Sequence, residues 1–316
     1  MSPWSSPLLR RPWFGHRPLL SVVVVSYNMT RELKRTLYSL SPKFQRDVKA
    51  QDYEVIVVDN GSTLPPDPSD WIQRPGWSVR VVCRPAGDVS PCRAVNAGVA
   101  QARARHVCVM VDGARMVSPG LISGLLNILR ADPDALAITL GFHLGMQPQN
   151  VSITQGYNQR EEDRLLRKIR WRNNGYQLFS VSCLALSSAG GWFAPIAESN
   201  CFALKRKSFQ ALGGFDERFQ SPGGGLVNLD FFRTAIASPL LRPWMLLGEG
   251  SFHQIHGGVA TNVPMEKHPG LQFALEYEQI RGESYAPPRY EPSYYGSMPE
   301  VTRRWIDPST AVTNAS

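Results

Sequence analysis

Two short apolar runs near the N-terminus constrain the fold of this chain more than any other feature. The first spans residues 21–28 (SVVVVSYN) and the second residues 53–62 (YEVIVVDNGS), and both end on polar residues. A helical pattern over residues 31–40 separates them, so the sequence predicts a β-α-β unit with parallel strands. Ligands of open α/β sheets bind at the carboxyl ends of such strands. Four polar residues occupy those ends and are candidate ligand contacts: Ser26, Tyr27, Asn28 and Asp59.

Strand and helix patterns continue to alternate, which predicts an α/β fold with a Rossmann-like, doubly wound sheet. Further strands are expected at residues 77–83, 106–111, 135–142, 201–204 and 245–253. Further helices are expected at residues 90–105, 118–130, 159–171, 208–212 and 227–237. The many charges of residues 159–171 suit a solvated face or a mobile flap. After residue 263 the sequence is rich in Pro and Tyr, and we expect it to wrap around the surface.

An acidic residue follows the strand predicted at residues 106–111. Asp112 precedes Gly113 and Ala114, and Arg115 comes next. A carboxylate at a strand end can recruit a divalent metal, and charge that develops on a leaving phosphate needs such cationic help. Asp112 is therefore a candidate metal ligand and phosphate contact, and Arg115 can supply part of the cation directly. A turn residue that caps the following loop is the structural alternative for Asp112.

Two histidines three positions apart close the last predicted strand. His253 and His256 precede Gly257 and Gly258. On a straight strand their side chains would point to opposite faces, so a bend at the strand end is needed to bring both imidazoles to one metal. Imidazole is the commonest metal ligand. A hydrogen bond to a phosphate or to the backbone is the alternative role for one of them.

Two polar residues lie one turn apart on the helix predicted at residues 90–105. Arg93 falls in its first turn and Asn96 follows on the same face. Donors at a helix N-terminus suit a phosphate, which makes both residues candidate ligand contacts. Helix capping and loop support are equally consistent with their positions.

Seven segments occur in an order that resembles the family 2 glycosyltransferases of the GT-A fold. They cover residues 20–258 and are VVVVSYN, VVDNGS, the helix with Arg93 and Asn96, VDGA, GGFDERF, Asn-x-Asp and His-x-x-His-Gly-Gly. The resemblance implies a nucleotide-sugar site in which the first strand end and Asp59 hold the base and the ribose. It aligns Asp112 with the first acid of a D-x-D motif whose second acid is absent here. It also implies that His256, with His253, completes the metal site.

The resemblance further implies a general base on the acceptor side. After GGFDERF, members of the family carry an acidic stretch, usually Glu-Asp-x-Asp, which here reads Val-Asn-Leu-Asp at residues 227–230. The amide of Asn228 does not titrate, so Asp230 is the acid that survives in this stretch. Glu198, in the loop before residues 201–204, is the other candidate. We expect one of the two to be the catalytic base, with Asp230 preferred, in a single displacement with inversion.

The resemblance also implies how the chain is organised. Residues 1–18 are expected to form an N-terminal extension, residues 19–262 a GT-A domain with an acceptor-side subdomain, and residues 263–316 a C-terminal tail. Within the domain, residues 19–130 would bind the donor and residues 131–262 the acceptor.

Charge and cysteine content bear on partners and location. The net charge of +8 suggests anionic partners, such as a nucleotide, a lipid-linked substrate or a membrane surface. No basic block with interleaved aromatic residues occurs, so no nucleic-acid partner is expected. The five cysteines are odd in number and form no C-x-x-C, which favours a cytoplasmic location. Aromatic and basic residues near the N-terminus also allow peripheral contact with the inner face of a membrane.

Together these features predict a glycosyltransferase. It would move a sugar from a nucleotide-sugar donor to a saccharide, lipid-linked or small-molecule acceptor, with the help of a divalent metal, Mn or Mg. The incomplete D-x-D motif and Asn228 leave a non-catalytic sugar- or nucleotide-binding member of the family as an alternative. A nucleotidyltransferase is a second alternative, although SYNMT after the first strand is not a Gly-rich phosphate loop.

Overall fold

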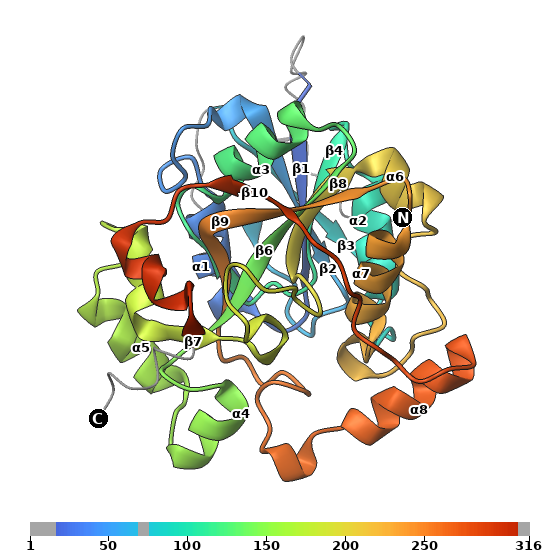
Figure 1. Ribbon diagram of the computed structural model, residues 1–316. Helices are drawn as coiled ribbons and strands as arrows, with labels where there is room; N and C mark the ends of the chain where they lie inside the picture. Colours follow the sequence, from blue (N-terminus) through green and yellow to red (C-terminus); the bar gives the residue numbers. More distant parts are fainter. Residues whose placement is uncertain (1–16, 69–75, 309–316) are drawn as a thin grey trace, which may run out of the picture.

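A ten-stranded sheet lies at the centre of the computed structural model, which describes residues 17–68 and 76–308 (Figure 1). Its main path follows the order β10-β9-β6-β8-β4-β1-β2-β3, while β5 pairs with β9 and β7 with β6. The strands are β1 (Leu20–Ser26), β2 (Tyr53–Asp59), β3 (Ser78–Cys83), β4 (His106–Met110), β5 (Arg115–Val117), β6 (Ala135–Leu144), β7 (Ser182–Leu184), β8 (Cys201–Lys205), β9 (Arg242–His253) and β10 (Ser293–Gly296).

The predicted β-α-β unit is confirmed. β1 and β2 pair in parallel, with Ser26 opposite Asp59, and helix α1 (Thr30–Leu40) connects them. β3 and β4 extend this part of the sheet in parallel on either side. β8 then pairs antiparallel with both β4 and β6, and β6 runs parallel to β9. The carboxyl ends of β4, β1 and β2 therefore share one edge of the sheet, where the sequence predicted ligand contacts.

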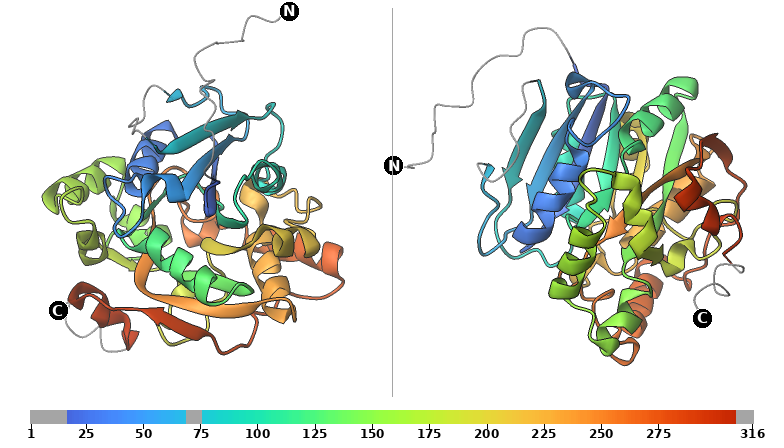
Figure 2. Two further views of the ribbon diagram at one scale, coloured as in Figure 1. Left: turned by 90° about the horizontal axis from the view of Figure 1, so that it is seen from above. Right: turned by 90° about the vertical axis from the view of Figure 1, so that its left-hand side faces the viewer.

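Helices cover both faces of the sheet (Figure 2) because the buried strands present apolar side chains to each side. Val22 and Val24 of β1 pack in one core with residues of α1 and α3 (Leu121–Ala131). Val23 and Val25 point to the opposite core, with residues of α2 (Cys92–Ala100) and α7 (Val227–Ala237). The other helices are α4 (Gln149–Ser152), α5 (Gln159–Lys168), α6 (Arg206–Ala211) and α8 (Gly270–Arg281).

Several elements differ from their predicted bounds. α2 ends at Ala100 instead of residue 105, because side chains of the neighbouring strands capture the following backbone groups. Ser21 Oγ accepts from the N–H of Ala104, and Glu54 Oε1 accepts from that of Arg103. β5 and β7 were not predicted, since three residues are too few to show a periodic pattern.

The segment after residue 263 does more than wrap around the surface. It forms α8, which buries Phe273 and Tyr277, and β10, which pairs in parallel with β9 (Figure 1). Trp305 enters the core and is 4% exposed. This segment therefore completes one end of the sheet.

The predicted N-terminal extension lies outside the described residues, except for its last two positions. Among the described residues, none of the helices has the length and apolar character that a membrane span would require.

Candidate active site

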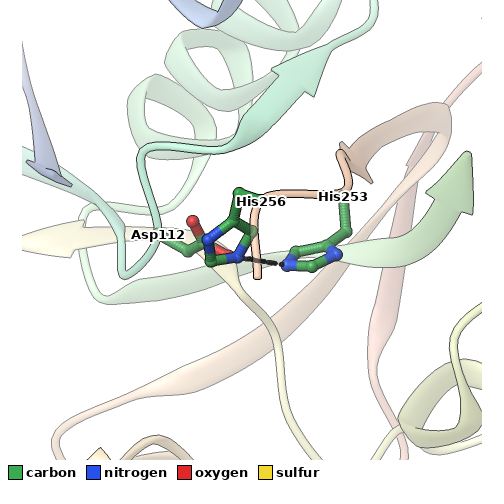
Figure 3. Close-up of side chains that lie close together, drawn as sticks. All are labelled: Asp112, His253 and His256. Atoms are coloured by element: carbon green, nitrogen blue, oxygen red, sulfur yellow. Dashed lines mark hydrogen bonds and ion pairs between the residues drawn. The ribbon is translucent and has the colours of Figure 1, made fainter. Parts of the chain in front are cut away.

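Asp112, His253 and His256 converge at the carboxyl edge of the sheet (Figure 3). Asp112 Oδ2 lies 2.9 Å from His253 Nε2 and 3.5 Å from His256 Nε2, and the two Nε2 atoms are 3.2 Å apart. Atoms bound at right angles to one ion at about 2.1 Å lie about 3 Å from each other. The spacing and the chemistry of these three groups therefore fit a single divalent metal, and no other such cluster occurs in residues 17–68 and 76–308.

The local backbone explains how these three side chains meet. Asp112 lies in the turn between β4 and β5, and its Oδ1 accepts from the N–H of Ala114, at 2.8 Å. β5 pairs with the end of β9 so that Arg115 is opposite His253. β9 ends at His253, and the chain then bends, which brings His256 to the same side. The predicted bend is thus present, and Asp112 both caps its turn and faces the histidines.

The charged groups of this cluster affect one another's pKa values. Burial by itself would raise the pKa of Asp112, but His256 and His253 in their protonated forms outweigh it and hold this pKa well below its usual range. Burial opposes a charge on His256, yet the Asp112 carboxylate raises the pKa of His256. Burial dominates at His253 and lowers its pKa to about 4. His253 is therefore neutral at physiological pH, the form in which an imidazole can bind a metal.

Arg115 lies beside the cluster with unused hydrogen-bond donors. Its side chain is buried, and its Nε is 4.0 Å from Asp112 Oδ2. Neither Nε nor Nη1 has a hydrogen-bond partner among the described residues. A buried guanidinium group with free N–H groups suits an anionic ligand.

The predicted donor residues lie on the adjoining strand ends. Ser26 and Asp59 are register partners and are both buried, whereas Tyr27 is 51% exposed. Both oxygens of Asp59 accept from Ser62, one from its hydroxyl at 2.5 Å and one from its N–H at 3.1 Å. The Ser62 hydroxyl oxygen in turn accepts from the N–H of Asn28, so the two strand ends are tied together.

Gly113 explains how the Asp112 turn reaches these strand ends. A Cβ atom at Gly113 would lie 2.8 Å from the carbonyl oxygen of Val25 and 3.3 Å from the Cβ of Ser26. Only glycine permits this close approach. The turn that carries Asp112 therefore packs directly against the end of β1.

Arg93 and Asn96 have structural partners. Asn96 accepts from the N–H of Phe215 and donates to its carbonyl oxygen, both at 2.9 Å. Arg93 Nε is 3.2 Å from Glu217 Oε2. Both side chains thus hold the turn at residues 213–217 against α2, and the loop-support alternative describes their contacts.

The two candidate bases have very different surroundings. Both oxygens of Asp230 accept from Arg281, at 2.7 and 2.6 Å. Glu198 Oε2 instead accepts from the amide of Asn228, at 2.6 Å. Asn228 is buried, and its Oδ1 has no partner among the described residues. The carboxylate that lies beside position 228 therefore belongs to Glu198, in a different segment of the chain.

The strand register relates the loop of Glu198 to the turn of Asp112. Cys201 at the start of β8 pairs with Met110 at the end of β4. The loop that carries Glu198 therefore leaves the same sheet edge as Asp112.

Sequence reasoning missed two amide side chains of this site. Gln149 Oε1 lies 2.7 Å from His253 Nδ1, and Asn262 Oδ1 accepts from the N–H groups of three consecutive residues that begin at His256. The turn signals at Gly257 and Gly258 were visible, but no pattern linked them to Gln149.

Comparisons with known proteins agree with this architecture. The sequence model of the family described as "Glycosyl transferase family 2" matches residues 21–212. A validoxylamine A glucosyltransferase from Streptomyces hygroscopicus subsp. jinggangensis (strain 5008) is 25% identical over 303 residues, which cover 86% of this chain and 69% of that protein. Its counterpart from Streptomyces hygroscopicus subsp. limoneus is also 25% identical, and the match covers 64% of its length.

A solved structure has a similar fold. The crystal structure of S. aureus TarS 1-349 in complex with UDP-GlcNAc has a TM-score of 0.50 and 14% identity, over 82% of this chain and 66% of that one. A longer TarS structure has a TM-score of 0.49 and 14% identity. That match covers 75% of this chain and only 36% of the TarS chain.

Proposed function

The chain belongs to glycosyltransferase family 2, and we propose that it transfers a sugar from a nucleotide-sugar donor to an acceptor hydroxyl at the carboxyl edge of its sheet. One observation carries this proposal. A carboxylate and two imidazoles converge beside strand ends that present Ser26 and Asp59, in a fold of the GT-A type. This arrangement supports a site for a nucleoside diphosphate with a bound cation.

The donor is a nucleotide sugar, and a uridine diphosphate sugar is the first to test. The TarS structure of similar fold was solved with UDP-GlcNAc. In this chain Asp59 would contact the base or ribose, and the exposed ring of Tyr27 is free to stack on the base. Ser26 and Asn28 line the same strand end.

Asp112, His253 and His256 would hold the divalent metal. Two imidazole ligands favour Mn²⁺ over Mg²⁺, because Mg²⁺ prefers oxygen ligands and bound water. When bound, the metal neutralises negative charge on the departing diphosphate. Arg115 supports this by offering its unpartnered N–H groups to the same phosphates. A D-x-D motif has its second acid at the position of Ala114. The positive charge of Arg115 would compensate for the absence of that acid.

Glu198 is the better candidate for the general base. It would take the proton of the acceptor hydroxyl as the new glycosidic bond forms and the bond to the diphosphate breaks. Asn228 holds the Glu198 carboxylate through one oxygen, at 2.6 Å, and leaves the other available. Asp230 has both oxygens bound by Arg281, which makes it a poorer proton acceptor and a structural ion pair.

The names of two relatives bear on the class of acceptor. The curated relatives are named as glucosyltransferases of validoxylamine A, which supports a small-molecule acceptor. All five cysteines are free thiols, which supports a reducing compartment such as the cytoplasm. A lipid-linked acceptor and peripheral membrane contact are the alternatives to test.

A screen of nucleotide sugars tests the function. Release of nucleoside diphosphate is measured with each donor, in Mn²⁺, in Mg²⁺ and in chelator, for the wild type and Asp112→Asn. We expect release from one class of donor, dependent on metal and greatly reduced in the variant. Binding of nucleotide without any release would instead support a non-catalytic member of the family. Absence of both binding and release would overturn the proposal.

A further inference from the structure

Two buried amide side chains connect the ligands of the proposed metal site. Gln149, the first residue of α4, is fully buried beneath the end of β9. Its Oε1 is 2.7 Å from His253 Nδ1 and accepts from Asn262 Nδ2 at 2.8 Å. Asn262 lies in the loop after His256. A chain of hydrogen bonds therefore runs from one histidine to the loop that holds the other.

Backbone groups fix the direction of both amides. Gln149 Nε2 donates to the carbonyl oxygens of His253, at 3.0 Å, and Leu144, at 3.4 Å. Carbonyl oxygens can only accept hydrogen bonds, so the end of the Gln149 amide that faces them must be its amino group. The amide oxygen of Gln149 therefore faces His253 Nδ1.

Asn262 is oriented in the same way. Its Oδ1 accepts from the N–H groups of His256, Gly257 and Gly258, each at 3.0 Å. Since N–H groups can only donate, its amino group must face Gln149. Neither amide can be turned over without losing backbone hydrogen bonds.

The fixed direction of Gln149 determines the hydrogen on His253. An amide oxygen can only accept a hydrogen bond. The hydrogen between Gln149 Oε1 and His253 Nδ1 must therefore be bound to Nδ1. In the neutral imidazole, Nε2 then carries a lone pair and no hydrogen, and it lies 2.9 Å from Asp112 Oδ2, 3.2 Å from His256 Nε2 and 3.5 Å from Thr261 Oγ1. Because Nε2 and the Asp112 carboxylate are then both acceptors, this arrangement suits a cation between them. Metal ligation requires such a lone pair.

We propose that Gln149 and Asn262 form an amide relay that presets His253 as an Nε2 ligand and holds His256 beside it. They are positioning residues, because neither belongs to the cluster of Asp112, His253 and His256 that would hold the metal. Gln149 fixes the tautomer of His253. Asn262 orients Gln149 and closes the loop at residues 256–258. The inference rests on the proposed metal site, but the tautomer itself can be measured without any metal.

The chain offers a matched control for this relay. Asn150, next to Gln149, donates to the carbonyl oxygens of Ala260 at 2.7 Å and Val263 at 2.8 Å. It anchors the same loop but contacts neither histidine ring nor the amide of Gln149. An effect that arises from loosening the loop should appear in Asn150→Ala. An effect on the His253 tautomer should not.

The test is the tautomer of His253 in the metal-free protein. Full-length protein labelled with ¹⁵N-histidine is kept in chelator at about pH 8, and long-range ¹H–¹⁵N spectra assign the protonated ring nitrogen. We expect Nδ1–H in the wild type and in Asn150→Ala. Gln149→Met cannot accept a hydrogen bond, so we expect it to populate Nε2–H, which can donate to Asp112. Gln149→Glu still accepts from Nδ1 and should restore the wild-type tautomer.

Metal binding gives the second measurement. Calorimetry with Mn²⁺ in the presence of UDP should show 10- to 100-fold weaker binding for Gln149→Met, as loss of such outer contacts typically costs. Gln149→Glu should bind more tightly than Gln149→Met.

The outcomes separate the relay from the proposed function. Nε2–H in the wild type overturns the relay, whether or not the variants fold. A retained Nδ1–H in Gln149→Met overturns it as well. If the tautomers are as predicted but neither the wild type nor any variant binds Mn²⁺, the relay is supported and the metal site is contradicted.

Discussion

At the scale of single residues, the roles of the acids in this site depend on what already binds their oxygens. Asp112 divides its two oxygens between the N–H of Ala114 and the histidines. Glu198 receives one hydrogen bond from Asn228, whereas Asp230 is bound on both oxygens by Arg281. Because a base needs a free lone pair at the acceptor, these contacts favour Glu198 as the proposed base, whereas the sequence motif favoured Asp230.

The first prediction concerns this pair. Glu198→Gln keeps the shape of the side chain but removes proton acceptance, so turnover should fall by about 10²–10⁴-fold with little change in donor affinity. Asp230→Asn should leave turnover within a few-fold. It should lower the free energy of unfolding by about 1–3 kcal/mol, since it weakens a charged pair. Steady-state kinetics, donor calorimetry and urea unfolding measure these effects. Near-normal turnover in Glu198→Gln would rule it out as the base.

The second prediction concerns the nucleotide. Asp59→Ala should weaken binding of free nucleoside diphosphate by about 1.5–3 kcal/mol, the usual loss for hydrogen bonds to a charged group. Ser62→Ala is the control, because it removes the 2.5 Å bond within the turn but keeps the Asp59 carboxylate. Calorimetry without metal compares the two variants. Equal losses would mean that Asp59 acts only by supporting the turn.

At the scale of elements, charged side chains fasten α5 to α1. Arg31 and Arg35 of α1 pair with Asp163 and with Glu162, which is completely buried. Glu162 Oε2 also accepts from the N–H of Ile255, at 2.7 Å, one residue before His256. The expectation of a solvated or mobile helix is therefore wrong for this face of α5. The helix therefore supports the bend that carries His256.

The third prediction follows from the burial of Glu162. Burial raises its pKa to about 7, against the opposing effects of the Ile255 N–H and of Arg31 and Arg35. Because this pKa is raised on folding, its contribution to stability is complete below about pH 4.5 and is lost as pH rises through about 7. The stability of Glu162→Gln relative to wild type should therefore rise by about 2–3 kcal/mol between pH 4.5 and pH 8. Urea unfolding at both pH values measures this difference, and a constant difference would contradict the raised pKa.

At the scale of the whole molecule, the C-terminal segment and the site share one core. The ring centroids of Trp305 and Phe142 are 4.7 Å apart. Phe142 also stacks on Phe252, which lies one residue before His253. Trp192 Nε1 donates to the carbonyl oxygen of Thr302, which fastens the segment to the loop before β8. Residues at the far end of the sequence therefore support the strand that carries His253.

The fourth prediction tests this dependence. Trp305→Ala should lower the free energy of unfolding by about 3–5 kcal/mol, as removal of a buried aromatic side chain typically does. Tyr294→Ala, on the exposed strand β10, is the matched control and should cost far less, because Tyr294 is 40% exposed. Denaturant unfolding compares the two. Similar small losses in both variants would show that the segment is not part of the cooperative core.

Local patterns in the sequence were enough to predict several parts of this protein. The run of valines in β1 and the polar residues after it predicted a β-α-β unit, which the structure contains, and a ligand site at its carboxyl edge, which stays a prediction. Asp112 and the histidine pair could be recognised because each lies at or just after a strand end. Such positions follow from periodicity and turn chemistry within a few residues.

The contacts by which distant segments complete the candidate site became visible in the folded chain alone. Asn228 contacts the carboxylate of Glu198, which is 30 residues earlier in the sequence. Gln149 contacts His253, which is 104 residues later. Trp305 enters the core from a segment that looked like a surface tail. Hydrogen bonds and packing between such positions leave no periodic trace in the sequence, because they depend on which strands become neighbours in the sheet and not on the residues beside them in the chain.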